Sequence, residues 1–458
     1  MSASRNNHSD RLGSDGVGSL LFRLSVPAIV GMTAMATYNL VDAIFIGRFV
    51  GAFGLAGLTV VFPIQMFVTG LGIMMGIGGS SVVSRALGAQ NPKRAELCLG
   101  NLVSTALVAS FCVIVPVLIF HPVLLKTFGA TSQTLPYSAA YLRIVVSGGV
   151  FPMLAIMLNN QVRAQGDART SMFIMLLGCG SNIVLDALFV PVLGWGIRGA
   201  AAATVLGQGL MCVLLLGYFR SAKSALKLRL CNLKISGAIL GETLAVGFPI
   251  FARHIGGSLM MILANRALRA QDGATALAVF GILNRLLRFM FMPLIGIVQG
   301  VRPIIGYNYG AGYLDRMRRA VLHGIRVLSL FSLVFFAVLQ LFPRPLFSVF
   351  SSDPAVVDLG VYAIRIFILG VPTIGFQIMT GTMFQAIGRP KPALFISMGR
   401  QFLFLIPLLL ILPNYLGHQG IWMSFPIADC VGAILAFALF KREMKRLDSS
   451  WQPAKMAE

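Results

Sequence analysis

The sequence is poor in charged residues and poorest in acids. Only 11% of its 458 residues are charged, with 15 Asp and Glu against 37 Lys and Arg. A soluble domain has roughly a quarter of its residues charged, because its surface must face water. Here 57% of the residues are hydrophobic and the mean hydropathy is +0.83. These values exclude a soluble enzyme and a disordered chain, and they indicate a protein that lies in lipid.

The excess of positive charge, +22, is of the size that often indicates nucleic-acid binding. That function needs basic residues clustered on a soluble surface, whereas here long apolar stretches separate them. The six cysteines show no metal-ligand spacing, and we expect neither disulfides nor a cofactor. We therefore expect no nucleic-acid partner and no enzymatic activity.

Twelve stretches are long and apolar enough to cross a bilayer, which takes about 20 residues. They are 20–45, 54–79, 98–120, 137–161, 171–191, 199–219, 239–265, 275–300, 320–342, 360–385, 393–412 and 420–440. They do not alternate between apolar and polar residues, as the strands of a barrel would. The sequence predicts an all-α polytopic membrane protein.

The basic residues predict the orientation of these spans. Most of those outside the spans, Arg163 and Arg302 among them, fall in segments on the same side as the N-terminus. The opposite side has few, namely Arg48, Lys126, Arg198, Arg266, Arg269 and Arg344. Because positive residues stay inside, we expect both termini in the cytoplasm and the protein in the cytoplasmic (inner) membrane. The polar residues 1–18 do not resemble a cleavable signal peptide.

The two halves of the chain repeat each other. At a nearly constant separation, Pro27 aligns with Pro249, and Gly88-Ala89 aligns with Gly310-Ala311. Each half has six spans, an even number, so the halves point the same way and are related by a pseudo-two-fold axis along the membrane normal.

This repeat predicts two six-helix lobes of an alternating-access transporter. The expected parts are an N-terminal tail (1–19), an N-terminal lobe (20–219), a basic cytoplasmic linker (220–238), a C-terminal lobe (239–440) and a C-terminal tail (441–458).

Several motifs resemble those of the multidrug and toxic compound extrusion (MATE) family, in particular its MepA-like and DinF-like branch. They are Ser25-Val26-Pro27-Ala28, Ala86-Leu87-Gly88-Ala89-Gln90, Arg163-Ala164-Gln165-Gly166-Asp167 and the stretch 299–311, QGVRPIIGYNYGA. The resemblance covers about residues 20 to 440. It implies efflux of amphipathic, often cationic, compounds in exchange for Na+ or H+, by a rocker-switch movement of the lobes.

Three acids lie inside predicted spans, Asp42, Asp186 and Asp429. A charge at the bilayer centre costs at least about 2.5–3.5 kcal/mol, so each needs a partner or a function. Counted from the span ends, Asp42 and Asp186 reach a similar depth to Thr204 and Tyr141. We therefore expect these four side chains to meet in the outer half of the N-terminal lobe.

Helical spacing adds two neighbours to this group. Tyr38 precedes Asp42, and Asn182 precedes Asp186, by four residues, so each pair shares a helix face. These oxygens suit either a hard monovalent cation, such as Na+ at Asp42, Asn182, Asp186 and Thr204, or one shared proton. The resemblance implies the same coupling site, with Tyr38 and Tyr141 as hydrogen-bonding neighbours. The alternative is that these polar groups only hold helices together.

The C-terminal lobe differs, since no acid lies inside its seventh or tenth span. Glu242 stands only at the entry of the seventh span and Asp358 precedes the tenth. Arginines are present instead, Arg253, Arg285, Arg288, Arg365 and Arg400. We expect Asp429 to pair with Arg400 in a structural role.

Three further residues in the N-terminal lobe are candidates for the transport cycle. Pro27 lies within the first span, where proline permits a kink, and it is a candidate conformational hinge. Asn159 and Asn160 are candidate amides of the substrate cavity or of its hydrogen-bond network. Methionines are frequent in this lobe and suit binders of varied shape.

The expected partners are amphipathic or cationic drugs and membrane lipids, with the protein acting as a monomer. The main alternative function is a lipid-linked oligosaccharide flippase, which shares this superfamily's architecture. A major-facilitator transporter would have a charged loop between its second and third spans, whereas residues 84–89 read SRALGA. The sequence leaves the choice between Na+ and H+ open.

Overall fold

The computed structural model describes residues 7–271 and 273–449, and within these ranges the ordered elements are helices. Residues 1–6 and 450–458 of the two predicted tails lie outside the described residues, as does the side chain of Arg269. Long helices follow from long apolar segments, because every backbone polar group in lipid must be satisfied within the segment itself.

The N-terminal half begins with a short helix, α1, followed by the helices of the N-terminal lobe. Their bounds are α1 Asn7–Ser14, α2 Val17–Phe49, α3 Ala52–Gly88, α4 Pro92–Thr127, α5 Leu135–Ser147, α6 Val150–Ala164, α7 Ala168–Ala187, η1 Leu188–Val192 and α8 Gly196–Arg220. The predicted linker contains only a short turn of helix, η2 Leu230–Leu233.

The C-terminal lobe consists of a second series of membrane-spanning helices. Its bounds are α9 Gly237–Gln271, α10 Gly273–Gly310, α11 Leu314–Leu341, α12 Pro343–Ser348, α13 Pro354–Phe367, η3 Ile368–Gly370, α14 Val371–Ala386, α15 Pro390–Met398, η4 Gly399–Leu405 and α16 Ile406–Ser449.

The number of spans agrees with twelve once the breaks are considered. Within the described residues, 10 helical segments are long and apolar enough to cross a membrane, and the pair α5 and α6 makes an eleventh. One of the 10 is Pro390–Ser449, whose 60 residues would extend about 90 Å as a straight helix, three times the bilayer core. It breaks at Gly417, whose φ of 56° and ψ of −140° are not helical, and so makes two spans.

Several predicted spans differ from the structure in shape, and the fifth and tenth contain the short segments η1 and η3. The fourth, predicted as continuous over 137–161, bends by 50° between α5 and α6, at Gly148 and Gly149. The eleventh, predicted over 393–412, contains the π-helical segment η4. Hydropathy detects the apolar run but not a local change of helix type within it.

The helices also extend beyond the predicted spans. Hydropathy places the end of the second span at residue 79, but α3 continues to Gly88. Its last turns contain Ser81, Ser84 and Arg85, which contact the other lobe rather than lipid, so they carry no hydropathy signal.

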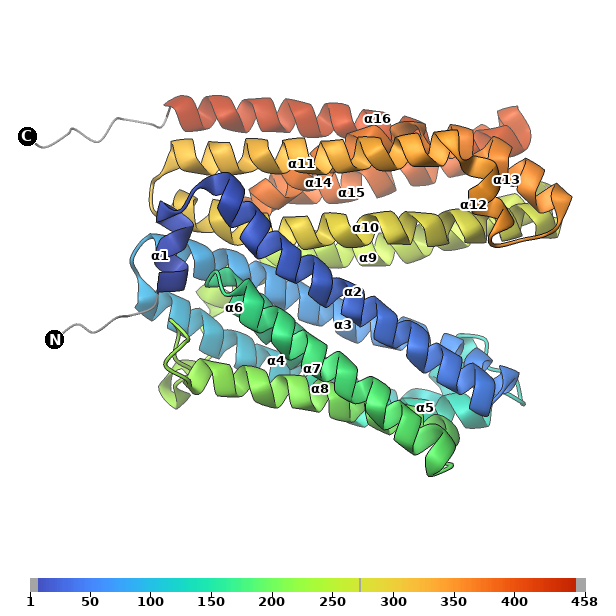
Figure 1. The fold of residues 1–458 in the computed structure, drawn as a ribbon, viewed down its shortest axis with the longest axis horizontal. Helices are drawn as coiled ribbons and strands as arrows, with labels where there is room; N and C mark the ends of the chain where they lie inside the picture. Colours follow the sequence, from blue (N-terminus) through green and yellow to red (C-terminus); the bar gives the residue numbers. More distant parts are fainter. Residues whose placement is uncertain (1–6, 272, 450–458) are drawn as a thin grey trace, which may run out of the picture.

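The two lobes converge at the end of the molecule where both chain termini lie and diverge toward the other end (Figure 1). We call these ends the termini side and the far side. On the termini side, α2 and α3 of one lobe pack against α9 and α10 of the other. A Cβ atom on Gly88 would lie 2.0 Å from the carbonyl oxygen of Tyr307, and one on Gly310 would lie 2.1 Å from that of Arg85. These glycines, aligned in the sequence repeat, let the two lobes meet backbone to backbone.

Polar contacts reinforce this closure. Arg85 of the N-terminal lobe forms an ion pair with the carboxylate of Glu242 on α9 at 2.9 Å, and Arg94 donates a hydrogen bond to the same carboxylate at 2.7 Å. The side-chain amide of Asn308 on α10 donates to the carbonyl of Leu12 in α1 at 2.9 Å. Leu12 is fully buried, so α1 belongs to the closed end of the molecule.

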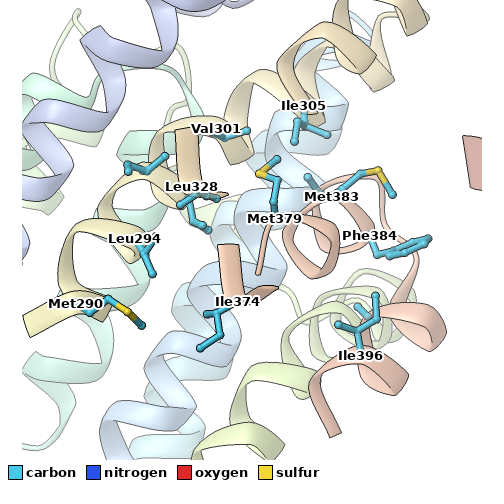
Figure 2. Packing of buried hydrophobic residues seen from close by; sticks show 14 of the residues in the cluster. Met290, Leu294, Val301, Ile305, Leu328, Ile374, Met379, Met383, Phe384 and Ile396 are labelled. Atoms are coloured by element: carbon cyan, nitrogen blue, oxygen red, sulfur yellow. The ribbon is translucent and has the colours of Figure 1, made fainter. Parts of the chain in front are cut away.

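The core of the C-terminal lobe is an apolar cluster between α10, α11, α14 and α15. Val301, Leu328 and Met379 lie close to one another in Figure 2, and Ile305 and Phe384 belong to the same buried cluster. All five are almost completely buried, which joins these helices into one body.

Candidate functional site

The two acids predicted for the N-terminal lobe lie on neighbouring helices. Asp42 is on α2 and Asp186 is on α7, and these helices pack along their length. Both are buried, with Asp42 6% exposed and Asp186 fully covered. They are close enough for the charge of Asp42 to act on Asp186. The helices thus bring together two residues that are far apart in the sequence.

The predicted polar neighbours surround this pair. Asn182 lies one turn before Asp186 on α7, and Tyr38 lies one turn before Asp42 on α2. Thr204 on α8 and Tyr141 on α5 lie close to each other, and the charge of Asp42 also acts on Tyr141. The structure therefore assembles all six side chains from four helices. We call them the acid cluster.

Several oxygens of the acid cluster have no partner. Buried atoms without a hydrogen bond in the described structure include one carboxylate oxygen of Asp42, both of Asp186, the amide oxygen and nitrogen of Asn182, and the hydroxyl of Thr204. The salt bridges of the described residues include neither Asp42 nor Asp186. Buried polar groups are normally paired, because an unpaired one costs free energy. A group of unpaired oxygens is therefore suited to hold a hard cation or a proton.

The oxygen atoms of the acid cluster are poorly suited to bind softer metal ions. Carboxylate, amide and hydroxyl oxygens suit hard cations, whereas zinc and copper favour imidazole and thiolate. Among the described residues, no group of three or more His, Cys, Asp and Glu side chains could hold a metal ion. The oxygens present fit Na+ or H+.

A cavity adjoins the acid cluster. Tyr38, Asn182 and Thr204 line it together with the methionines Met35 and Met175. It leaves about 40 Å³ for the centres of water-sized groups. The lining of this cavity therefore combines flexible apolar side chains with members of the acid cluster.

Two glutamines near the acid cluster escape prediction from the sequence. Gln65 on α3 donates to the hydroxyl of Tyr141 at 3.4 Å. Gln208 on α8 lines the same cavity as Thr204 and lies near the hydroxyl of Tyr38. The four-residue spacing from Thr204 could have indicated Gln208, whereas no local pattern indicates Gln65.

The other predicted residues of this lobe lie apart from the acid cluster. Asn159 on α6 accepts hydrogen bonds from Arg163 and from the hydroxyl of Ser171, the latter at 2.8 Å. Asn160 donates to a backbone carbonyl of its own helix. Pro27 is buried within α2, which continues past it as a single helix.

The C-terminal lobe has the ion pair that its sequence predicts. Arg400 on η4 donates to the carboxylate of Asp429 on α16, which is 3% exposed. The prediction of this pairing is confirmed. Glu242 is likewise paired, with Arg85 and Arg94.

Two basic residues assigned to segments outside the spans are unexpectedly buried. Arg163 and Arg302 lie beyond the predicted spans, near the C-terminal ends of α6 and α10, and are only 8% and 6% exposed. Closure of the two lobes buries them, and no local sequence pattern reveals that contact.

Comparison with known proteins decides the family. The MatE family model matches the chain twice, over residues 27–188 and 249–411. The chain belongs to the MATE family. One match falls in each lobe, in agreement with the internal repeat, and the protein is a multi-pass membrane transporter rather than an enzyme.

Individual relatives align with nearly the whole length of this chain. The multidrug export protein MepA of Staphylococcus saprophyticus is 26% identical over 423 residues, which cover 92% of each chain. The MATE multidrug transporter DinF-BH, a solved structure, is 41% identical, covers 96% of this chain and 98% of its own, and superimposes with a TM-score of 0.88. A structure described as the outward-facing conformation of a multidrug resistance MATE transporter is 25% identical, covers 98% and 100%, and has a TM-score of 0.90.

Proposed function

We propose that this MATE transporter is a secondary active multidrug antiporter, which exports amphipathic or cationic compounds in exchange for Na+ or H+. The observation that carries the proposal is the acid cluster, where Asp42 and Asp186 are buried without a basic partner. An unpaired carboxylate in a membrane interior needs a proton or a cation to offset its charge. Uptake and release of that ion would couple the ion gradient to the conformation of the lobe.

The arrangement of the cavity supports exchange rather than cotransport. Tyr38, Asn182 and Thr204 belong to the acid cluster and also line the methionine-containing cavity. A cationic drug in this cavity would face the same negative charge that the coupling ion offsets. Drug and ion would therefore compete, which is the physical basis of antiport. The multidrug names of MepA and DinF-BH support this class of substrate.

The two lobes provide the moving parts of the proposal. We propose that the N-terminal lobe (20–219) and the C-terminal lobe (239–440) rock about the linker (220–238). We also propose that the protein lies in the inner membrane with both termini in the cytoplasm. In that orientation, the conformation described above, which is closed on the termini side, would be open to the outside of the cell. Pro27 as the hinge of this movement, and a monomeric state, stay predictions.

The flippase alternative is not favoured. The relatives and solved structures reported above are multidrug transporters. In addition, the arginine nearest the buried acid of the C-terminal lobe, Arg400, is engaged with Asp429. A flippase would need such cations available for a pyrophosphate.

The test is efflux of a fluorescent organic cation from proteoliposomes under separately imposed Na+ and H+ gradients. We expect one gradient to drive transport and the other to have little effect, which identifies the coupling ion. Equal transport with no gradient, or an Asp42→Asn protein that responds to the gradient as the wild type does, would contradict the proposal.

A further inference from the structure

A small cavity lies between the lobes, apart from the acid cluster. It is lined by Ser80 of α3, Asn160 and Arg163 of α6, and Gln299 and Arg302 of α10. About 10 Å³ is available to the centre of a water-sized group, which is room for a single small species. Both lobes contribute to its wall, so the cavity exists only while they are in contact.

The two arginines of this cavity are buried without a counter-charge. Arg163 donates through Nη1 to Asn159 and, at 2.9 Å, to the hydroxyl of Ser171. These bonds hold one edge of its guanidinium and leave the other edge without a hydrogen bond among the described residues. Arg302 forms no hydrogen bond or ion pair with them, and its buried Nε has no partner.

The like charges of the arginines around this cavity repel one another. The charge of Arg302 acts on Arg163, and that of Arg253 acts on Arg302, all with the same sign. The acid on the termini side of α9, Glu242, is paired with other arginines. Burying like charges without a partner costs far more than burying a neutral polar group. A water molecule would accept hydrogen bonds but leave both charges, whereas an anion would accept the bonds and offset the charge.

We propose that this cavity binds one small inorganic anion, of which chloride is the abundant example, between Arg163 of the N-terminal lobe and Arg302 of the C-terminal lobe. The space is too small for a phosphate group or an organic acid. The bound anion joins the lobes on the termini side and so stabilises the state closed there. This second step rests on the alternating access proposed above, whereas the binding itself does not.

The test measures the thermal unfolding midpoint of the purified full-length protein in nanodiscs. Chloride replaces gluconate at constant ionic strength. Because chloride binds the folded protein, the midpoint stays nearly constant below the dissociation constant and rises with the logarithm of the chloride concentration above it. Arg302→Gln removes a charged donor without breaking any hydrogen bond of the described protein, and it raises the dissociation constant obtained from this dependence at least about tenfold. Arg288→Gln, an exposed arginine of the same helix, leaves it unchanged.

A second variant and a direct measurement guard against misfolding and indirect effects. Arg163→Lys keeps the charge but loses the fork geometry, and we expect weaker binding with an intact fold. Anomalous diffraction from crystals grown in bromide places the ion between Arg163 and Arg302. A chloride response that is the same in the wild type and Arg302→Gln, or bromide bound elsewhere, would overturn the proposal.

The conformational step has its own readout. Spin labels introduced at positions 93 and 391, one in each lobe on the termini side, report the closure of that side. We expect chloride to increase the short-distance population in the wild type and not in Arg302→Gln. Anion binding with no change in these distances contradicts the second step alone. Intact binding in a protein that fails to transport drugs contradicts the proposed function and leaves the anion site in place.

Discussion

The buried carboxylates of the two lobes differ in their surroundings. In the N-terminal lobe, Asp42 and Asp186 have oxygens without any partner in the described structure. In the C-terminal lobe, Asp429 is equally buried but accepts from Arg400. A paired carboxylate is already compensated, whereas an unpaired one must take up an ion. Burial alone therefore does not separate the two acids that we propose for ion coupling from Asp429, whereas the absence of a partner does.

The largest effect is expected from neutralising the unpaired acids. Asp42→Asn and Asp186→Asn each keep the shape of the side chain and remove the charge that an ion would offset. We expect gradient-driven efflux to fall to the level of protein-free liposomes in either variant. The control is the double variant Asp429→Asn/Arg400→Gln, which removes a compensated pair and keeps transport. If the double variant loses transport while the single ones keep it, the comparison of the lobes is reversed.

Two glycines permit a second comparison, Gly88 at the contact between the lobes and Gly281 in the first turns of α10. Gly88→Ala places a Cβ 2.0 Å from the carbonyl oxygen of Tyr307, whereas a Cβ at Gly281 meets nothing within 4 Å. Overpacking costs about 1–3 kcal/mol, and here it falls on the state closed at the termini side. We expect Gly88→Ala to slow transport about tenfold and to depopulate that state, as measured by distances between spin labels. Gly281→Ala is the matched control, and equal behaviour of the two variants would contradict the backbone contact.

The paired acid should matter for stability rather than for coupling. Arg400→Gln leaves Asp429 buried without its cation, at a cost toward the lower end of about 3–5 kcal/mol because Arg400 is partly exposed. Thermal unfolding of the variant in nanodiscs measures this loss. We expect the ion concentration that half-saturates transport to stay within about twofold of the wild type. A large shift of that concentration with no loss of stability would make Asp429 a coupling residue.

The smallest effect is expected from a neutral member of the acid cluster. Thr204→Ala removes one unpaired hydroxyl oxygen and keeps both acids. The loss of one neutral ligand corresponds to about a two- to tenfold weaker apparent affinity for the coupling ion. Ion titrations of transport measure it, with Ser181→Ala as the control, since the Ser181 hydroxyl donates to the carbonyl of Gly178 in its own helix. An unchanged affinity in Thr204→Ala would remove Thr204 from the site.

Much of the acid cluster could be predicted because a helix relates nearby residues in a simple way. Tyr38 and Asp42, like Asn182 and Asp186, share a helix face because they are four residues apart. Counting from the ends of the spans also gives a common depth for Thr204 and Tyr141. Gln65 could not be found in this way, because its approach to Tyr141 depends on how α3 packs against α5.

The helical membrane fold, the twofold repeat and the scarcity of acids can all be read from the residues alone, because lipid restricts a chain to apolar helices and makes each charge conspicuous. Which charges are compensated follows only from how the helices pack. Arg400 reaches Asp429, no cation of the described residues pairs with Asp42 or Asp186, and closure of the lobes buries Arg163 and Arg302 together. Pairing depends on the distance between side chains from different helices, and that distance follows from the packing of the lobes rather than from any local pattern.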